Sequence, residues 1–175
     1  MKRLYLLRHA KSSWNQLGQE GHERPLNERG RKNALEIGQF MRNNDLVPNL
    51  IVCSTSERTR ETCSILLSGI EREIACQFTE ELYLANATTI LNIVHGASDE
   101  SDSLMLITHA PGVAEAALML GQYGNDQANK LIEQKYPTGA LGIFDSKADM
   151  WVDVSPENCR LIDFIRPKYL SAGCE

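Results

Sequence analysis

Four short apolar runs constrain the fold of this chain more than any other feature of its sequence. They are LYLL at 4–7, LIVC at 50–53, LMLI at 104–107 and LGIF at 141–144. Continuous apolarity over so few residues is typical of strands buried on both faces, as in a parallel sheet. Between the runs, apolar residues recur at helical spacing over 27–42, 56–67, 87–95 and 111–120. This alternation predicts a three-layer α/β/α sandwich with a mostly parallel central sheet.

The last part of the chain predicts two further strands. MWVDV at 150–154 alternates, and LIDFI at 161–165 follows it after a Ser-Pro-Glu-Asn turn. Such a pair is typical of an antiparallel hairpin at a sheet edge. No internal repeat, linker or low-complexity segment is visible, so we expect residues 1–175 to form a single domain.

Charge and cysteine usage limit the partners and the compartment. Eighteen basic and twenty-three acidic residues give a net charge of −5 without any basic run, so we expect no binding to nucleic acid. Arg29, Arg31 and Arg42 are predicted to lie on a solvated helix face. No apolar run is long enough for a membrane span, and because strand-like residues begin at position 3 we expect no signal peptide. Five cysteines without a CxxC pair favour free thiols, and we expect a cytoplasmic protein.

Chemically active residues follow three of the four apolar runs. Arg8 and His9 follow the first, STSERTRET with Arg58 follows the second, and THAPG with His109 follows the third. Because open α/β sheets bind ligands at the carboxyl ends of their strands, we expect these side chains to meet at one edge. Arginine matches phosphate oxygens bidentately, and neutral imidazole accepts a phosphoryl group near pH 7. The pattern therefore predicts a phosphate site.

Two other kinds of phosphate chemistry fit the sequence less well. The four histidines show neither HxH nor HxxxH spacing and no acidic cluster accompanies them, so we expect no metal site. Cysteine-dependent phosphatases need Cys-x5-Arg, but Thr59 stands where Cys53 would need the arginine. Cys53 is therefore predicted to be a buried structural thiol.

The same residues resemble the histidine phosphatase superfamily, whose fold is called phosphoglycerate-mutase-like, and within it the phosphohistidine phosphatases of the SixA type. The resemblance rests on LYLLRHAKSSW, RPLNERG, SxxxRTRET and THAPG, which span nearly the whole chain. It implies a metal-independent phosphatase without a cofactor. The implied reaction removes phosphate from phosphohistidine on a protein, or from a related small phosphorylated substrate, through a phosphorylated His9.

The resemblance also implies a role for each matching residue. His9 would be the nucleophile, Arg8 and Arg58 would bind the phosphate, and His109 would stabilise the transition state. Arg24 of RPL lies near the phosphate in the SixA-like branch. Asn15 matches the asparagine of the wider RHGxSxWN pattern, where it either touches the phosphate or bonds its own backbone in a loop.

The family's proton donor is an acid after the third strand. Glu80 and Glu81 in TEELYLA stand near that position, and Glu81 is the candidate that we carry forward. The other interpretation is a solvated pair of surface glutamates. A phosphohistidine substrate would tolerate the lack of an acid better than a phosphate monoester, because imidazole leaves more easily than an alkoxide.

Three alternative functions share these features. A small-molecule phosphomonoester phosphatase and a mutase of the same superfamily would use the same histidine chemistry, although mutases carry insertions that this compact chain lacks. A non-catalytic phosphate-binding module is a third alternative, against which the intact set of Arg8, His9, Arg58 and His109 argues. The sequence leaves the physiological substrate, the pathway and the oligomeric state open.

Overall fold

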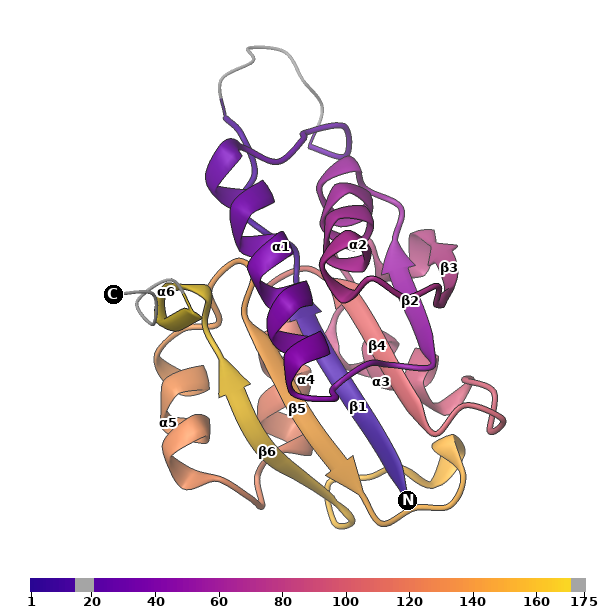
Figure 1. The fold of residues 1–175 in the computed structure, drawn as a ribbon. Helices are drawn as coiled ribbons and strands as arrows, with labels where there is room; N and C mark the ends of the chain where they lie inside the picture. The colour runs from indigo at the N-terminus through magenta and orange to yellow at the C-terminus, as the bar shows by residue number, and fades with distance from the viewer. Residues whose placement is uncertain (15–20, 171–175) are drawn as a thin grey trace.

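In the computed structural model, residues 1–14 and 21–170 are described, and they build one six-stranded sheet with helices on both faces (Figure 1). The strands, in sheet order, are β3 (Ala75–Thr79), β2 (Leu50–Ser54), β4 (Ser103–Thr108), β1 (Lys2–Arg8), β5 (Leu141–Ser146) and β6 (Cys159–Ile165). Strands β3, β2, β4 and β1 are parallel, and only β5 runs in the opposite direction. The predicted α/β sandwich with a mostly parallel sheet is confirmed.

Two apolar clusters lie on opposite faces of the sheet. One face is covered by α1 (Glu28–Asn43), α2 (Glu57–Ile70) and α6 (Pro167–Leu170), and the other by α3 (Ala87–His95), α4 (Gly112–Leu120) and α5 (Asp126–Gln134). In β1, Leu4 and Leu6 pack into the cluster beneath α3, α4 and α5, whereas Tyr5 and Leu7 pack against α1 and α2. Successive side chains of a strand point to opposite faces, which is why the buried strands are continuously apolar.

Helices α1 and α2 approach each other so closely that their backbones touch. A Cβ atom added to Gly38 of α1 would lie 2.3 Å from the carbonyl oxygen of Leu66, and one added to Gly69 of α2 would lie 2.6 Å from that of Leu35. The two helices begin at side-chain caps, since Asn27 accepts from the amide of Gly30 and Ser56 from that of Thr59. This tight packing determines the position of the first turn of α2 relative to the sheet.

The structure corrects part of the strand prediction. The segment MWVDV is not a strand, because Trp151–Asp153 forms a short 3-10 helix. Trp151 is buried there, and its indole Nε1 donates to the carbonyl of Ser101 at 2.8 Å. LIDFI does lie in β6, but the strand that pairs with β6 is β5. Strand β5 is therefore antiparallel to β1, although its apolar run resembles those of the parallel strands.

The helix predictions over 27–42, 56–67, 87–95 and 111–120 are confirmed by α1, α2, α3 and α4. Strand β3 and helix α5 are additional elements. Among the described residues, every helix is too short or too polar to cross a membrane.

Candidate active site

The register of the two central parallel strands brings the two histidines together. Arg8 of β1 is paired with Thr108 of β4, so His9 and His109 are the next residues on adjacent strands. The amide of His9 donates to the carbonyl of Thr108 at 3.0 Å, which extends the ladder by one bond. The imidazole centroids lie 5.2 Å apart. Two residues that are far apart in the sequence thus become neighbours at the carboxyl edge of the sheet.

Arg58 joins the two imidazole rings. It is the second residue of α2, which starts directly after β2, and it is buried. Its Nε donates to Nε2 of His9 at 3.4 Å, and its Nη2 donates to Nδ1 of His109 at 3.1 Å. Its remaining terminal nitrogen, Nη1, donates to the carbonyl of Gly21. The guanidinium therefore lies in one place between both rings and the loop before α1.

The hydrogen bonds of His9 define which of its ring nitrogens carries the proton. Nδ1 lies 2.8 Å from the carbonyl oxygen of Ala10, an atom that can only accept. Nε2 faces the Nε–H of Arg58, a group that can only donate. The neutral ring is therefore protonated on Nδ1, and the lone pair of Nε2 is directed toward the arginines. The loop that supplies the Ala10 carbonyl is held by Thr62 of α2, whose hydroxyl accepts from the Ala10 amide at 3.0 Å.

His109 carries its proton on the opposite nitrogen. Its Nδ1 accepts from Arg58, so Nε2 bears the hydrogen and donates to the hydroxyl of Ser54 at 2.8 Å. Ser54 ends β2, the strand beside β4. Both histidines are thus oriented by neighbours from a second strand or a helix, a requirement for a preorganised site.

Burial and positive charge keep both histidines neutral. Burial, together with the charges of Arg58, Arg8 and Arg24, lowers the pKa of His9 to about 3. Burial and the charge of Arg58 also lower the pKa of His109 to about 3, with smaller contributions from His9, Arg8 and His22. An uncharged imidazole with an unprotonated nitrogen is the form that can attack phosphorus.

Two further arginines direct donors into this region. Nη1 of Arg8 donates to the carbonyl of Tyr136 at 2.8 Å, and the guanidinium of Arg24 stacks 3.8 Å from the ring centroid of Trp14. The Nε atoms of Arg8 and Arg24 are buried, and neither has an acceptor among the described residues. The charges of both arginines contribute to the lowered pKa of His9. Unpartnered donors beside a lone pair suit an anion with several oxygens.

The structure does not bring all the candidate residues together. Asn15 lies outside the described residues. Glu81 is exposed on the 3-10 helix Glu80–Leu82, where it borders a hollow over β3 and α3 together with Gln77 and Asn92. It shares no hydrogen bond or ion pair with the two histidines or the three arginines in the described parts of the chain. The position of Glu81 thus favours the interpretation of a surface glutamate.

Sequence analysis missed Tyr83, which lies two residues beyond Glu81 and does face the site. Its ring packs edge-on against His109 and His22, with centroid separations of 5.3 and 4.8 Å, and lies beneath the guanidinium of Arg58. His22 is held in turn by the hydroxyl of Thr55 at 3.0 Å. The place of Tyr83 just after the third strand was the one signal in the sequence that could have indicated it.

The thiol of Cys53 points away from the phosphate site. Its Sγ lies within hydrogen-bond distance of the carbonyls of Ser54 and Thr59, and the hydrogen bond with Cys63 together with burial raises its pKa. Within residues 1–14 and 21–170, no three His, Cys, Asp or Glu side chains are grouped in a way that would hold a metal ion. The positive charge around the two histidines comes from Arg8, Arg24 and Arg58.

Comparison with known proteins agrees with this geometry. The sequence profile described as histidine phosphatase superfamily (branch 1) matches residues 4–83. An uncharacterised protein of Mycobacterium leprae (strain TN) is 32% identical over 166 residues, which cover 93% of this chain and 100% of the relative. The profile covers Leu4 to Tyr83, whereas the similarity to the relative covers 93% of this chain.

Two solved structures have the same fold. The first is from Agrobacterium tumefaciens and is provisionally described as phosphohistidine phosphatase SixA. It is 30% identical, with a TM-score of 0.78 over 95% of this chain and 99% of its own. A second, similarly described protein from Nakamurella multipartitia is 22% identical, with a TM-score of 0.82 over 95% and 96% of the two chains, and it supports the fold alone. The sequence and structural matches together show that this chain is a phosphatase of the SixA type and belongs to the histidine phosphatase superfamily.

Proposed function

We propose that this protein hydrolyses phosphohistidine on a protein substrate through a phosphorylated His9. The observation that carries the proposal is the orientation of His9, whose unprotonated Nε2 points at Arg58 while Nδ1–H is held by the Ala10 carbonyl. A nucleophile needs an unprotonated nitrogen beside groups that can bind the equatorial oxygens of phosphorus, and this arrangement supplies both.

The reaction proceeds in two displacements. Nε2 of His9 attacks phosphorus, and the bond from phosphorus to the substrate imidazole breaks. The substrate ring carries a proton on its other nitrogen, so it departs as neutral imidazole, and the phosphoryl group now resides on His9. Nδ1 keeps its proton throughout, and the phosphorylated ring is therefore cationic and readily gives up its phosphoryl group. Water then attacks phosphorus, inorganic phosphate leaves, and neutral His9 is restored. Arg8 and Arg58 stabilise the oxygens in both steps, with Arg24 alongside, and His109 holds the Arg58 guanidinium in place through Nδ1.

The preference for phosphohistidine rests on the leaving group. In the described residues no carboxylate contacts His9, Arg58 or His109, so no carboxylic acid stands ready to protonate an alkoxide. A phosphoramidate needs such an acid less, because the departing imidazole is a weaker base than an alkoxide. The name of the Agrobacterium tumefaciens relative points to the same substrate class.

A labelled substrate panel tests this proposal. Wild-type protein is mixed with a phosphohistidine peptide, phosphoramidate or a phosphoserine peptide and quenched rapidly without acid. We expect faster turnover of the two P–N substrates, and protein-bound label on His9 that is stable to alkali and lost in acid. His9→Ala is expected to retain phosphate binding, because the arginines remain, and to lose turnover and label. Label on Cys53 or a serine would contradict the mechanism, and faster turnover of the ester would contradict the substrate class.

A further inference from the structure

A second cluster of cations lies at the same edge of the sheet, outside the phosphate site. It surrounds a pocket of about 240 Å³ lined by Arg29, Asn33, Lys135, Pro137, Thr138, Arg166, Pro167 and Lys168. Four of these side chains are positively charged and none is a carboxylate. None of the four cations forms an ion pair with a carboxylate in the described residues. This concentration of charge stands out on a chain whose net charge is −5.

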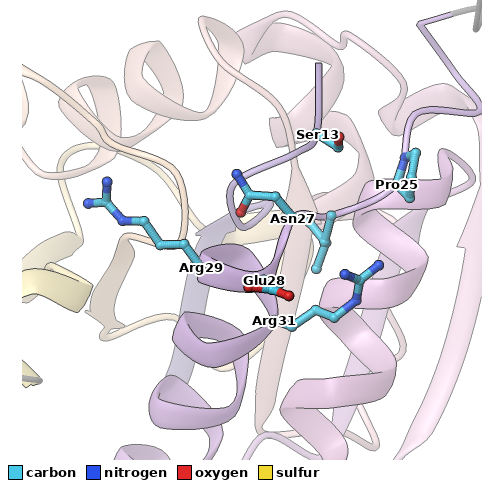
Figure 2. Close-up of a pocket in the computed structure, with 7 residues that line it drawn as sticks. Ser13, Pro25, Asn27, Glu28, Arg29 and Arg31 are labelled. Carbon is cyan, nitrogen blue, oxygen red and sulfur yellow. The ribbon is translucent and has the colours of Figure 1, made fainter. Parts of the chain in front are cut away.

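Arg29 is directed away from the acidic groups near it. Figure 2 shows Arg29 and Arg31 extending in opposite directions from the first turn of α1, with Glu28 between them. Arg31 pairs with Glu61 at 3.1 Å, whereas Arg29 borders both the shallow pocket of Figure 2 and the cationic pocket. One arginine of this turn is thus neutralised and the other is available.

The cationic pocket and the phosphate site are built on the same loop. The wall residues Pro137 and Thr138 are followed by Gly139, whose amide donates to the carbonyls of Arg8 and His9 at 3.0 Å. The carbonyl of Tyr136, just before this wall, accepts from the guanidinium of Arg8. A group bound in the pocket would therefore lie beside the backbone that carries the nucleophile.

The pocket is preformed by close packing of the Gly139 backbone on the ring of Pro167. Gly139 has a φ of 75°, and a Cβ atom there would lie 2.9 Å from Cγ of Pro167, so the loop packs directly on α6. Pro167 is itself buried. The carboxyl ends of β6 and β1 lie on the same edge of the sheet, so Lys168 of α6 stands at the same edge as His9 (Figure 1). The pocket is thus held in place relative to His9.

The size and charge of the pocket select its occupant. About 240 Å³ is below the usual range for a small-molecule site, roughly 300–1,000 Å³, but it accommodates carboxylate side chains. Because three of the four cations are exposed, they can meet a surface that approaches from solvent. Local charges of this kind determine the choice of partner and its rate of association.

We propose that this pocket, with Arg29, Lys135, Arg166 and Lys168 around it, binds an acidic segment of the protein substrate close to its phosphorylated histidine. The inference rests on the proposed function and adds to it a substrate class: acidic protein surfaces. The phosphate site recognises the phosphoryl group, and the cationic pocket recognises the chain that carries it.

Binding without catalysis tests the docking step. A labelled peptide with glutamates on both sides of an unphosphorylated histidine is titrated with the full-length protein by fluorescence anisotropy, and a peptide with glutamines at those positions is the comparison. We expect about tenfold tighter binding of the glutamate peptide at low salt, as for a complementary charged surface, and a loss of this advantage as the ionic strength rises. Equal binding of the two peptides would overturn the proposal.

Charge reversal locates the surface. Lys168→Glu and Arg29→Glu are each expected to remove most of the preference for the glutamate peptide. Lys147→Glu is the matched control, because Lys147 is exposed and follows β5 at the opposite edge of the sheet. If Lys147→Glu lowers the preference as much as Lys168→Glu does, the effect is one of net charge and the proposal is wrong.

Kinetics separate this proposal from the proposed function. With phosphohistidine forms of the two peptides, we expect Lys168→Glu to raise KM for the glutamate peptide several-fold and to leave kcat unchanged. Its turnover of phosphoramidate is expected to equal that of the wild type. An equal loss with phosphoramidate would assign the pocket to the phosphate site and overturn the docking role. If the wild type binds the glutamate peptide but hydrolyses neither phosphohistidine peptide, the proposed function fails while docking stands.

Discussion

Arg58 contributes three donors that point in three directions, to His9, to His109 and to the loop at Gly21. We expect Arg58→Ala to lower kcat/KM by a factor that corresponds to a loss of about 2–4 kcal/mol in transition-state stabilisation, as is typical for loss of one electrostatic donor at a reacting centre. Arg58→Lys is expected to lose nearly as much, because an ammonium group lacks the planar fork. Steady-state kinetics with phosphoramidate measure both.

The neighbouring Arg60 is the matched control for this prediction. Its side chain is exposed and lies over the ring of Phe78 at 5.3 Å, on the outer side of α2. Arg60→Ala is expected to change kcat/KM less than about twofold, as is usual for a surface side chain outside the site. Near-normal activity of Arg58→Lys would show that charge alone, and not the fork, is required.

The two neutral histidines also make the fold sensitive to acid. Their pKa values in the folded protein, about 3, lie below the ordinary value of 6.5. Between pH 3 and about pH 6.5 the unfolded chain binds more protons than the folded one. The stability that the neutral histidines contribute is therefore complete above about pH 6.5 and is lost as the pH falls toward 3. We expect the free energy of unfolding in urea to decline between pH 6.5 and 4, and to decline less in His109→Gln. Identical slopes for the two proteins would refute this account.

The sequence predicts the position of a site residue when its side chain is chemically distinctive and follows a recognisable strand. Arg8, His9, Arg58 and His109 could be placed at one edge because each follows a recognisable apolar run. Their supports could not, because the carbonyls of Ala10, Gly21 and Tyr136 that hold them belong to the backbone, and any residue type offers the same oxygen.

At the scale of elements, the contact between α1 and α2 determines where Arg58 is held. We expect Gly38→Ala to lower the free energy of unfolding by about 1–3 kcal/mol, because the new methyl group meets the Leu66 carbonyl. Activity is expected to fall as well, since Arg58 lies in the first turn of α2. Urea unfolding and phosphoramidate kinetics measure the two effects.

Gly96→Ala is the control for this helix contact. Gly96 follows α3, and a Cβ atom there would have its nearest neighbour at 3.5 Å, an ordinary packing distance. We expect little change in stability or activity. If Gly96→Ala and Gly38→Ala lower the free energy of unfolding equally, the loss reflects a general cost of replacing glycine and not the close approach of the helices.

Elements with one clear hydrophobic pattern could be predicted, and those without it could not. Strand β3 is an edge strand with mostly exposed side chains, so the sequence ACQFT carries no signal of burial. The alternation in MWVDV was misleading, because Trp151 is buried by a single helical turn that its hydrogen bonds to Asp99 and Ser101 hold in place. The direction of β5 could not be predicted either, since a central strand is apolar on both faces whichever way it runs.

For the whole molecule, the source of positive charge gives a prediction about cofactors. The groups at the phosphate site are the N–H donors of arginines and two neutral histidines. We therefore expect full activity after dialysis against excess chelator. The measurement is turnover of phosphoramidate before and after treatment. Loss of activity that a divalent cation restores would show that a metal takes part.

The cationic pocket shows what only the assembled molecule reveals. Its four charges stand at positions 29, 135, 166 and 168, on α1, on the segment after α5 and at the end of the chain. In the sequence they form no run, and Arg29 was predicted to lie on a solvated helix face. Only the order of the strands, with β6 beside β5 and β5 beside β1, brings them to one edge.

The central position of β1 has a consequence for how the protein reaches its active form. The first strand of the chain pairs with β4 and β5, and contacts at the site span 49 residues from His9 to Arg58 and 128 from Arg8 to Tyr136. Contacts over such separations form late, because long loops must close first. During refolding from urea, helical circular dichroism is therefore expected to return before phosphatase activity, and simultaneous recovery would contradict this order. The recovery of phosphatase activity thus measures when β1 has paired with β4 and β5.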